Sequence, residues 1–298
     1  MNTLYLNIFS GISGDMFLGA MLDLGVEFSQ LQAELAKLEL TGYHLRSRRE
    51  SRSGIEGIKF DVLDGESAVA ESPEDSAAHF HETSSESHTH GSKGHHHHEH
   101  HAHQPGDMQR DDDHGHDHSE SRDFAQIREL IGSSRLSSWV QDKSIAIFHR
   151  IAVAEGKIHG KPPENVHFHE VGAIDSIVDI VGACAALEML DKPRVLASPA
   201  VDGTGWVRCA HGRFPVPTTA TLEILSARRI PLTQCDEPHE LITPTGAALL
   251  AEFAEHFGPM HGLVADRIGY GLGTRENKTR PNVLRAILSR TSEAAVKG

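Results

Sequence analysis

A short stretch near the middle of the chain carries the side chains best suited to metal chemistry: His167, His169, Asp175 and Asp179. The two histidines are one residue apart, so in an extended segment both imidazoles point to the same side. The two aspartates are four apart, so on a helix they share one face. Imidazole and carboxylate together suit a borderline divalent cation such as nickel or zinc. The stretch therefore predicts a metal or substrate site, and the alternative is the solvated face of an amphipathic helix.

The charge around these aspartates favours a bound cation. No lysine or arginine lies between Lys161 and Lys192 to neutralise them. Like charges at this helical spacing cost about 0.2–0.5 kcal/mol, and a cation between them would reverse the sign. Gly172 interrupts the extended run, so we expect the helix that carries both aspartates to begin near Ala173.

Residues 66–121 have a different composition, in which Ser, Glu, Asp, Gly and His dominate and apolar residues nearly vanish. Such a segment cannot bury enough apolar surface to fold, so we expect a disordered insertion. It holds fourteen of the 23 histidines of the chain. Histidine-rich tracts bind divalent metals, but a segment without a core cannot pre-organise a reaction site. The metal ligands that we expect here include His95, His96, His97, His98, His100 and His101.

The first of two glycine-rich turns, residues 10–15 (SGISGD), follows a short apolar run and precedes a helical pattern. Exposed N–H groups at such a helix start bind anions readily. Ser10, Gly11, Ser13 and Gly14 are therefore candidates for substrate binding, and Asp15 is a candidate catalytic carboxylate. The turn is neither a P-loop nor a dinucleotide fingerprint. The alternative is a tight turn in which Ser13 or Asp15 caps the helix.

The second glycine-rich turn, residues 269–274, is followed by Arg275, Lys278 and Arg280. Glycines beside cations could cradle a phosphate, and a flexible hairpin loop is the alternative. The substrate-binding candidates of this turn are Gly271, Gly273 and Thr274.

Basic side chains also lie within and directly after residues 43–51, which we expect to form a strand. A solvated edge strand favours such charge, and a basic wall for an anionic substrate is the alternative. The cations of this segment are Arg46, Arg48, Arg49 and Arg52.

The elements that must position these residues alternate between apolar strands and amphipathic helices. We expect strands at 4–9, 43–51, 55–63, 195–201, 264–268 and 283–288. Helices are expected after residue 14, over 27–40, from 123 to about 160, from 173 to 190, from Pro217, and over 244–257. Thr243 and Pro244 fit the N-cap and first position of the last helix. The pattern predicts one α/β domain with a mixed sheet over 1–65 plus 122–290, and a tail at 291–298.

Composition excludes several classes of protein. The chain has 298 residues and a formal net charge of −14, which argues against nucleic-acid binding. Its three cysteines show no metal-ligand spacing and suggest reduced thiols. The N-terminus has no basic stretch and no long apolar run, and no 18 consecutive residues are apolar, so we expect no signal peptide and a cytoplasmic protein with no membrane contact. We also expect a homo-oligomer.

Five blocks in this order resemble the LarC family of nickel-insertion proteins. The blocks are SGISGDM at 10–16, HFHEVGAIDSIVDIVG at 167–182, HGRFPVP at 211–217, LITPTGAAL at 241–249, and GYGLGT with RPNVLR within 269–285. An internal histidine-rich loop is also typical of that family. The resemblance covers nearly the whole chain outside the insertion.

The resemblance implies a nickel chelatase, a lyase, of the lactate racemase cofactor pathway. Such proteins insert Ni(II) into pyridinium-3,5-bisthiocarboxylic acid mononucleotide and form one Ni–C and two Ni–S bonds. On this basis His167, His169, Asp175 and Asp179 would hold or pass the ion, and the glycine-rich turns would hold the phosphate. His169 and Glu170 are candidates for the base that takes the ring proton. The alternatives are a non-enzymatic nickel storage protein or chaperone and a metal-dependent phosphate-ester enzyme.

The family uses CTP with a divalent cation, and it associates CTP with a portion that has no counterpart after Arg290 here. We therefore expect this chain to bind nickel but to bind CTP weakly or not at all. A C-terminal fragment supplied in trans should then restore nucleotide-dependent insertion.

Overall fold

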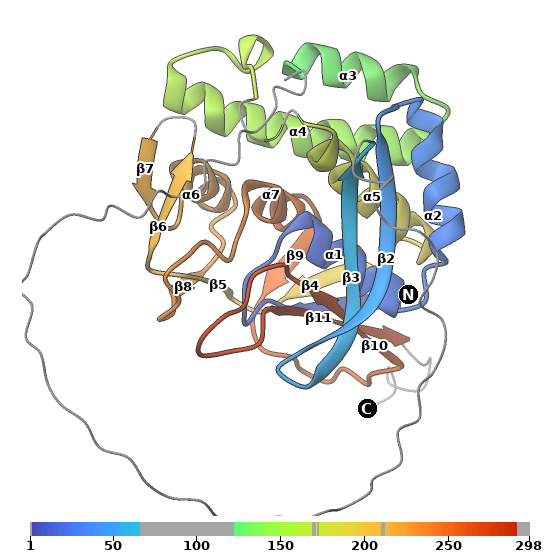
Figure 1. Cartoon of the computed structure of the whole chain (residues 1–298), viewed down its shortest axis with the longest axis vertical. Helices are drawn as coiled ribbons and strands as arrows, with labels where there is room; N and C mark the ends of the chain where they lie inside the picture. Colours follow the sequence, from blue (N-terminus) through green and yellow to red (C-terminus); the bar gives the residue numbers. More distant parts are fainter. Residues whose placement is uncertain (1, 66–121, 169–170, 172, 210–211, 291–298) are drawn as a thin grey trace, which may run out of the picture. The chain divides into compact units, whose positions relative to one another are not determined.

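The computed structural model describes residues 2–65, 122–168, 171, 173–209 and 212–290. Within these residues, a seven-stranded mixed sheet has the order β2-β3-β10-β11-β1-β4-β9 (Figure 1). β1 pairs antiparallel with β11 and parallel with β4, which makes the sheet mixed. Its strands are β1 (Asn2–Asn7), β2 (Tyr43–Arg52), β3 (Ile55–Asp64), β4 (Arg194–Ala197), β9 (Ala254–Phe257), β10 (Arg267–Leu272) and β11 (Val283–Arg290). The predicted α/β fold with a mixed sheet is confirmed.

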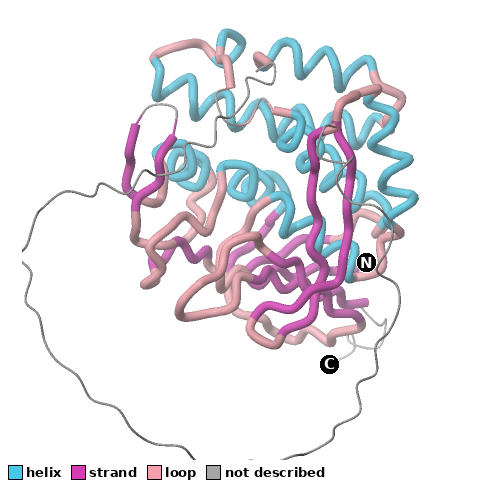
Figure 2. The backbone as a smooth tube through the Cα atoms, viewed as in Figure 1, coloured by secondary structure: helices cyan, strands magenta, loops and turns pink. Residues whose placement is uncertain are grey.

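Helices gather on one side of this sheet (Figure 2). They are α1 (Gly14–Asp23), α2 (Phe28–Leu35), α3 (Phe124–Ser133), α4 (Ser138–His159), α5 (Ile174–Met189), α6 (Thr219–Ala227) and α7 (Pro244–Phe253), with 3₁₀ turns η1 (Ala36–Leu38) and η3 (Pro163–Asn165). α1 packs against β3, β10 and β11, and α5 packs against α1. In the described residues no helix is both long and apolar enough to cross a membrane.

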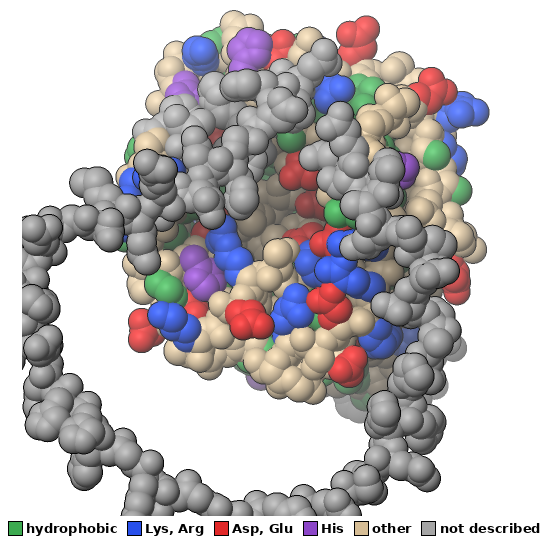
Figure 3. Space-filling model, in the orientation of Figure 1, with side chains coloured by type: hydrophobic (Ala, Val, Ile, Leu, Met, Phe, Trp, Pro, Cys, Tyr) green, Lys and Arg blue, Asp and Glu red, His purple; other side chains and the backbone are tan. Residues whose placement is uncertain are grey.

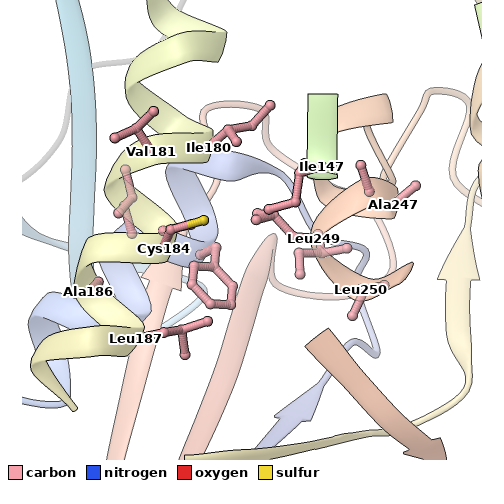
Figure 4. Close-up of a cluster of buried hydrophobic side chains, with 14 of the residues drawn as sticks. Ile147, Ile180, Val181, Cys184, Ala186, Leu187, Ala247, Leu249 and Leu250 are labelled. Atoms are coloured by element: carbon pink, nitrogen blue, oxygen red, sulfur yellow. The ribbon is translucent and has the colours of Figure 1, made fainter. Parts of the chain in front are cut away.

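The core between the helices is apolar and closely packed (Figure 4). α5 is almost entirely buried because apolar or small side chains occupy nearly every position after its first turn. Ile147 of α4, Cys184 of α5 and Leu250 of α7 lie in the same cluster, each at most 1% exposed. This packing fixes the N-terminal ends of α5 and α7 relative to α1.

The contacts of the edge strand β2 confirm the interpretation that its arginines belong to a solvated edge strand. Arg49 Nη2 lies 2.7 Å from Asp23 Oδ1, and Arg52 Nη1 lies 3.0 Å from Glu50 Oε2. Arg48 Nη1 lies 2.9 Å from Asp61 Oδ2. The strand is solvated, and these arginines are already paired with carboxylates.

The second glycine-rich turn is mostly strand, which corrects the prediction of a loop there. Residues 269–272 belong to β10, and an ideal Cβ on Gly271 would lie 1.7 Å from the Met16 carbonyl oxygen of α1. The glycine is needed because helix and strand approach too closely for a side chain. The sequence pattern could not distinguish this packing requirement from turn flexibility.

Three further boundaries differ from the predictions. Residues 195–201 form parts of two strands, β4 and β5 (Ala200–Asp202), and β5 pairs with β8 (Leu232–Gln234) outside the main sheet. Residues 206–216, for which no helix or strand is predicted, contain an antiparallel pair, β6 (Trp206–Cys209) and β7 (Gly212–Pro215). The last predicted helix ends at Phe253, and β9 then joins the sheet edge beside β4. In each case tertiary strand pairing overrides the local pattern.

Candidate functional site

One cavity of about 410 Å³ opens above the first turns of three helices. Its lining is acidic, with five carboxylates and one lysine: Asp15, Asp61, Asp175, Asp179, Glu240 and Lys59. Acidic side chains lie inside the hollow, and basic side chains lie along its rim (Figure 3). The remaining lining is small or hydroxylated, and Ser13, Ser176, Thr243, Thr245 and Thr274 contribute to it.

The N-termini of α1, α5 and α7 converge on this cavity. Ser13 is the N-cap of α1, and its side chain does not cap that helix. Ala173, the N-cap of α5, also provides no capping side chain, whereas Thr243 Oγ1 accepts from Gly246 N at 3.1 Å in α7. Helix N-termini carry partial positive charge and unsatisfied N–H groups. The cavity therefore combines groups that attract cations with groups that attract anions.

Backbone contacts hold the starts of α1 and α7 together. Ile12 N donates to the Leu241 carbonyl at 2.9 Å, and Thr243 N donates to the Ile12 carbonyl at 3.2 Å. Gly11 has a φ of +82°, and an ideal Cβ there would lie 2.1 Å from Leu241 O. Leu241 N in turn donates to Oδ1 of the fully buried Asp202 at 2.7 Å. The sequence motif 10–16 thus aligns two helix starts.

Among the described residues that line the cavity, Lys59 is the only cation, and the residue is 2% exposed. Its Nζ lies 2.7 Å from Asp15 Oδ2 and 3.0 Å from Asp61 Oδ1, and it donates to the Phe60 carbonyl at 2.8 Å. Burial by itself lowers the pKa of Lys59, but the charges and hydrogen bonds of both aspartates outweigh it and raise the pKa. Lys59 therefore stays charged and fixes Asp15, which also accepts a hydrogen bond from Ser13.

Asp179 has a carboxylate oxygen that no hydrogen bond of the described structure compensates. Its Oδ1 is buried with no hydrogen-bond partner in the described structure. Burial raises its pKa well above the ordinary value, and the charges of Asp15 and Asp175 raise it further, while Lys59 opposes them. An unpartnered buried carboxylate is costly unless a cation or proton compensates it. The geometry therefore indicates a place for a cation beside Asp179.

Asp175 lies one turn before Asp179, and the residue is exposed. Its Oδ1 accepts from Ser176 N at 2.8 Å, which directs the carboxylate to the N-terminus of α5. Among the described residues, no group of three or more His, Cys, Asp or Glu side chains is arranged to enclose a metal ion. The described carboxylates can thus offer an open, partial set of ligands rather than a closed structural site.

The structure brings six of the predicted site residues into the cavity lining: Ser13, Gly14, Asp15, Asp175, Asp179 and Thr274. The other predicted residues of the glycine-rich turns lie outside that lining. Ser10 is fully buried and its Oγ accepts from Asn277 Nδ2 at 2.9 Å, so it supports the turn. Gly11, Gly271 and Gly273 meet neighbouring atoms so closely that a Cβ would not fit.

His167 is exposed, and its backbone forms an isolated bridge with Asp123. It does not line the cavity, so the structure does not place it with Asp175 and Asp179. The remaining predicted ligands and base candidates lie outside the described residues: His169, Glu170, His95, His96, His97, His98, His100 and His101.

Three charged residues of the lining are not predicted as site residues from the sequence: Lys59, Asp61 and Glu240. Lys59 and Asp61 alternate with Phe60 in β3 and look like the polar face of an ordinary strand. A possible signal is that Lys59 and Asp61 lie on one strand face, where opposite charges separated by two residues can pair. Glu240 immediately precedes the block at 241–249 and has no distinguishing local pattern.

Comparisons with known proteins show which family the chain belongs to. The sequence profile of a family described as nickel insertion protein matches residues 4–297. A pyridinium-3,5-bisthiocarboxylic acid mononucleotide nickel insertion protein from Geobacillus kaustophilus is 41% identical over 298 residues, covering 100% of this chain and 62% of that protein. Proteins of the same name from Lactiplantibacillus plantarum and Desulfitobacterium hafniense are 46% and 37% identical, covering 97% and 98% of this chain and 61% and 60% of their own lengths.

The chain spans about three fifths of the length of these curated relatives. No solved structure matches the chain. Because the family profile and the similarity to the relatives both extend over nearly the whole sequence, this chain belongs to the nickel insertion protein family.

Proposed function

We propose that this chain inserts nickel into pyridinium-3,5-bisthiocarboxylic acid mononucleotide, the activity for which its relatives are named. The observation that carries the proposal is the unpartnered buried carboxylate oxygen of Asp179, in a cavity that it shares with Asp15 and Asp175. A divalent cation there would compensate three neighbouring negative charges at once.

Nickel is the cargo of this reaction and must leave the protein. Carboxylate oxygens suit nickel less well than imidazole does. An ion held by Asp175 and Asp179 through a few oxygen ligands can therefore pass to the two thiocarboxylate sulfurs of the substrate. A closed set of strong protein ligands would hinder that transfer.

Formation of the Ni–C bond requires that the ring C–H bond breaks and that its proton moves to a base. Asp15 is our candidate among the described residues because it faces the cavity and is held by Lys59 and Ser13. His169 and Glu170 are further candidates on the sequence argument. All three satisfy the chemical requirement for a proton acceptor.

The other parts of the proposal follow from the sequence. The histidine-rich insertion would collect nickel, and the exposed His167 could pass the ion on. CTP with a divalent cation would be used together with a C-terminal portion, supplied in trans to this chain. We further propose a cytoplasmic homo-oligomer that supplies the cofactor of lactate racemase.

Mass spectrometry of the precursor after incubation with this protein and nickel, with and without CTP and a C-terminal portion from a relative, tests the proposal. A product that has gained nickel and lost the ring proton supports insertion. Bound nickel without product in any mixture would favour a storage protein or chaperone. Phosphate release from p-nitrophenyl phosphate would favour a phosphate-ester enzyme.

A further inference from the structure

A loop that begins in the cavity lining at Thr274, residues 274–282 and here termed the rim loop, carries an excess of positive charge. It contains Arg275, Lys278 and Arg280 against one carboxylate, Glu276. In the described part of the chain, none of these three cations forms an ion pair with a carboxylate. The arginines of β2 differ, because Arg49 is paired with Asp23. The rim loop therefore offers positive charge that the protein does not neutralise.

The rim loop is held firmly by its backbone. Glu237 is fully buried, and its Oε2 accepts from Lys278 N at 3.0 Å. Its Oε1 accepts from Thr279 N at 2.7 Å and from Thr279 Oγ1 at 2.6 Å. Asn277 Nδ2 donates to Ser10 Oγ at 2.9 Å, which ties the loop to the turn before α1. These contacts fix the backbone and leave the Arg275 and Lys278 residues exposed.

Arg275 lies at the edge of the cavity. Its neighbour Thr274 lines the cavity, and Arg275 Nη1 lies 3.5 Å from the carbonyl oxygen of Glu240, another lining residue. Asn282 Nδ2 donates to the Arg275 carbonyl at 2.9 Å and holds the backbone there. A guanidinium has five N–H donors, so most of them remain available to an anion.

The charges of the cavity separate an anionic ligand from a cation. The five carboxylates of the interior outweigh Lys59 and the partial positive charges of the three helix N-termini, so a phosphate would be repelled there and attracted to the rim. We propose that Arg275, supported by Lys278, binds the phosphate of the mononucleotide substrate at the rim loop. This inference rests on the proposed function for the identity of the substrate. Binding of the phosphate at the rim loop would orient the pyridinium ring inward, toward Asp175 and Asp179.

The test compares two ligands that differ only in the phosphate, nicotinate mononucleotide and nicotinate riboside. Their affinities for the full 298-residue chain are measured by calorimetry without nickel, for the wild type and for Arg275→Gln, Arg275→Lys and Arg49→Gln. Arg49→Gln is the matched control, because it removes an exposed arginine that is already paired with Asp23. Thermal unfolding establishes that each variant is folded.

We expect the wild type to prefer the mononucleotide by tenfold or more, in line with a charged hydrogen bond of about 1.5–3 kcal/mol. Arg275→Gln should lose most of that preference, Arg275→Lys should retain part, and Arg49→Gln should retain it all. A wild type without preference, or without measurable binding of the mononucleotide, overturns the inference. Equal effects of Arg275→Gln and Arg49→Gln also overturn it. Failure of nickel insertion with a retained preference would instead contradict the proposed function alone.

Discussion

Gly14 and Asp179 touch across the interface of α1 and α5, because an ideal Cβ on Gly14 would lie 2.3 Å from Asp179 Oδ2. The first residue of α1 therefore has no room for a side chain. This contact places Asp179 at the N-terminus of α1, where the helix dipole favours negative charge. It joins two sequence blocks that are more than 150 residues apart into one site.

Replacing Gly14 by Ala should displace the Asp179 carboxylate or the first turn of α1. We expect a loss of about 1–3 kcal/mol in the free energy of unfolding, typical of an overpacked site, together with a loss of insertion. The matched control is Gly132→Ala in α3, where nothing lies within 4 Å of the added Cβ. That control should be neutral or slightly stabilising in chemical denaturation, and equal behaviour of the two variants would contradict the contact.

Replacing Asp179 by Asn should raise stability and abolish insertion. The change removes a carboxylate whose buried Oδ1 has no hydrogen-bond partner, so we expect about 1 kcal/mol of added stability and a Tm higher by about 2–4 °C. Calorimetry at neutral pH and without metal measures this shift. Asp142→Asn, at an exposed position of α4, should leave both properties unchanged. A lower Tm for Asp179→Asn would show that the carboxylate has a stabilising partner.

Stability should also depend on pH through Asp179. Burial and the neighbouring charges raise its pKa in the folded state above the ordinary value of the unfolded chain. Between these two values the folded state binds more protons, so the stability of the metal-free protein falls as pH rises through that window. Nickel competes with the proton, so its affinity should rise over the same window. The Tm difference between Asp179→Asn and the wild type should therefore grow with pH, and parallel curves would refute this assignment.

Replacing Lys59 by Met should leave Asp15 and Asp61 without their shared cation. Their side chains are 25% and 17% exposed, so we expect a cost of about 3 kcal/mol, the low end for a broken buried pair. Lys157→Met removes a 69% exposed lysine paired with Glu223 and should cost at most about 1 kcal/mol. Asp15→Asn added to Lys59→Met should recover part of the loss in urea denaturation. Similar costs for the two single variants would show that the Lys59 pair is not energetically buried.

Deleting residues 76–119 should lower the nickel bound per chain, because this removes most of the histidine-rich insertion. Insertion at saturating nickel should persist, and the Tm of the remaining chain should stay the same. A variant of unchanged length with His95, His96, His97, His98, His100 and His101 replaced by Ser separates the loss of ligands from the loss of chain length. Equilibrium dialysis measures the bound metal. Complete loss of insertion in a folded deletion variant would contradict a collecting role.

Much of the local structure near the site is predictable from the sequence. The start of α5 at Ile174 and the cap formed by Thr243 and Pro244 follow from short-range chemistry. The convergence of Asp15, Asp175 and Asp179 does not, because it depends on how α1 packs on α5. Lys59 was missed for the same reason, since its burial depends on neighbours contributed by α1.

The glycines illustrate a second limit of prediction from the sequence. Gly271 and Gly273 suggest either a phosphate cradle or a flexible hairpin loop, but Gly271 is a contact point between β10 and α1. Arg275, which we propose to bind the phosphate, lies just after these glycines, where the chain leaves the strand. Local composition indicated the correct region, whereas the packing of α1 determined which residues face the cavity.

The central claim is that Asp175 and Asp179 hold nickel for transfer into the mononucleotide. Mass spectrometry of the precursor tests it most directly, with nickel, CTP and a C-terminal portion of the Geobacillus relative added to the wild type and to Asp175→Asn with Asp179→Asn. We predict a nickel-containing product with the wild type and none with the double variant, while the histidine-rich insertion still binds nickel in both. Equal product formation by the two proteins would contradict the claim and assign these carboxylates to a solvated helix face.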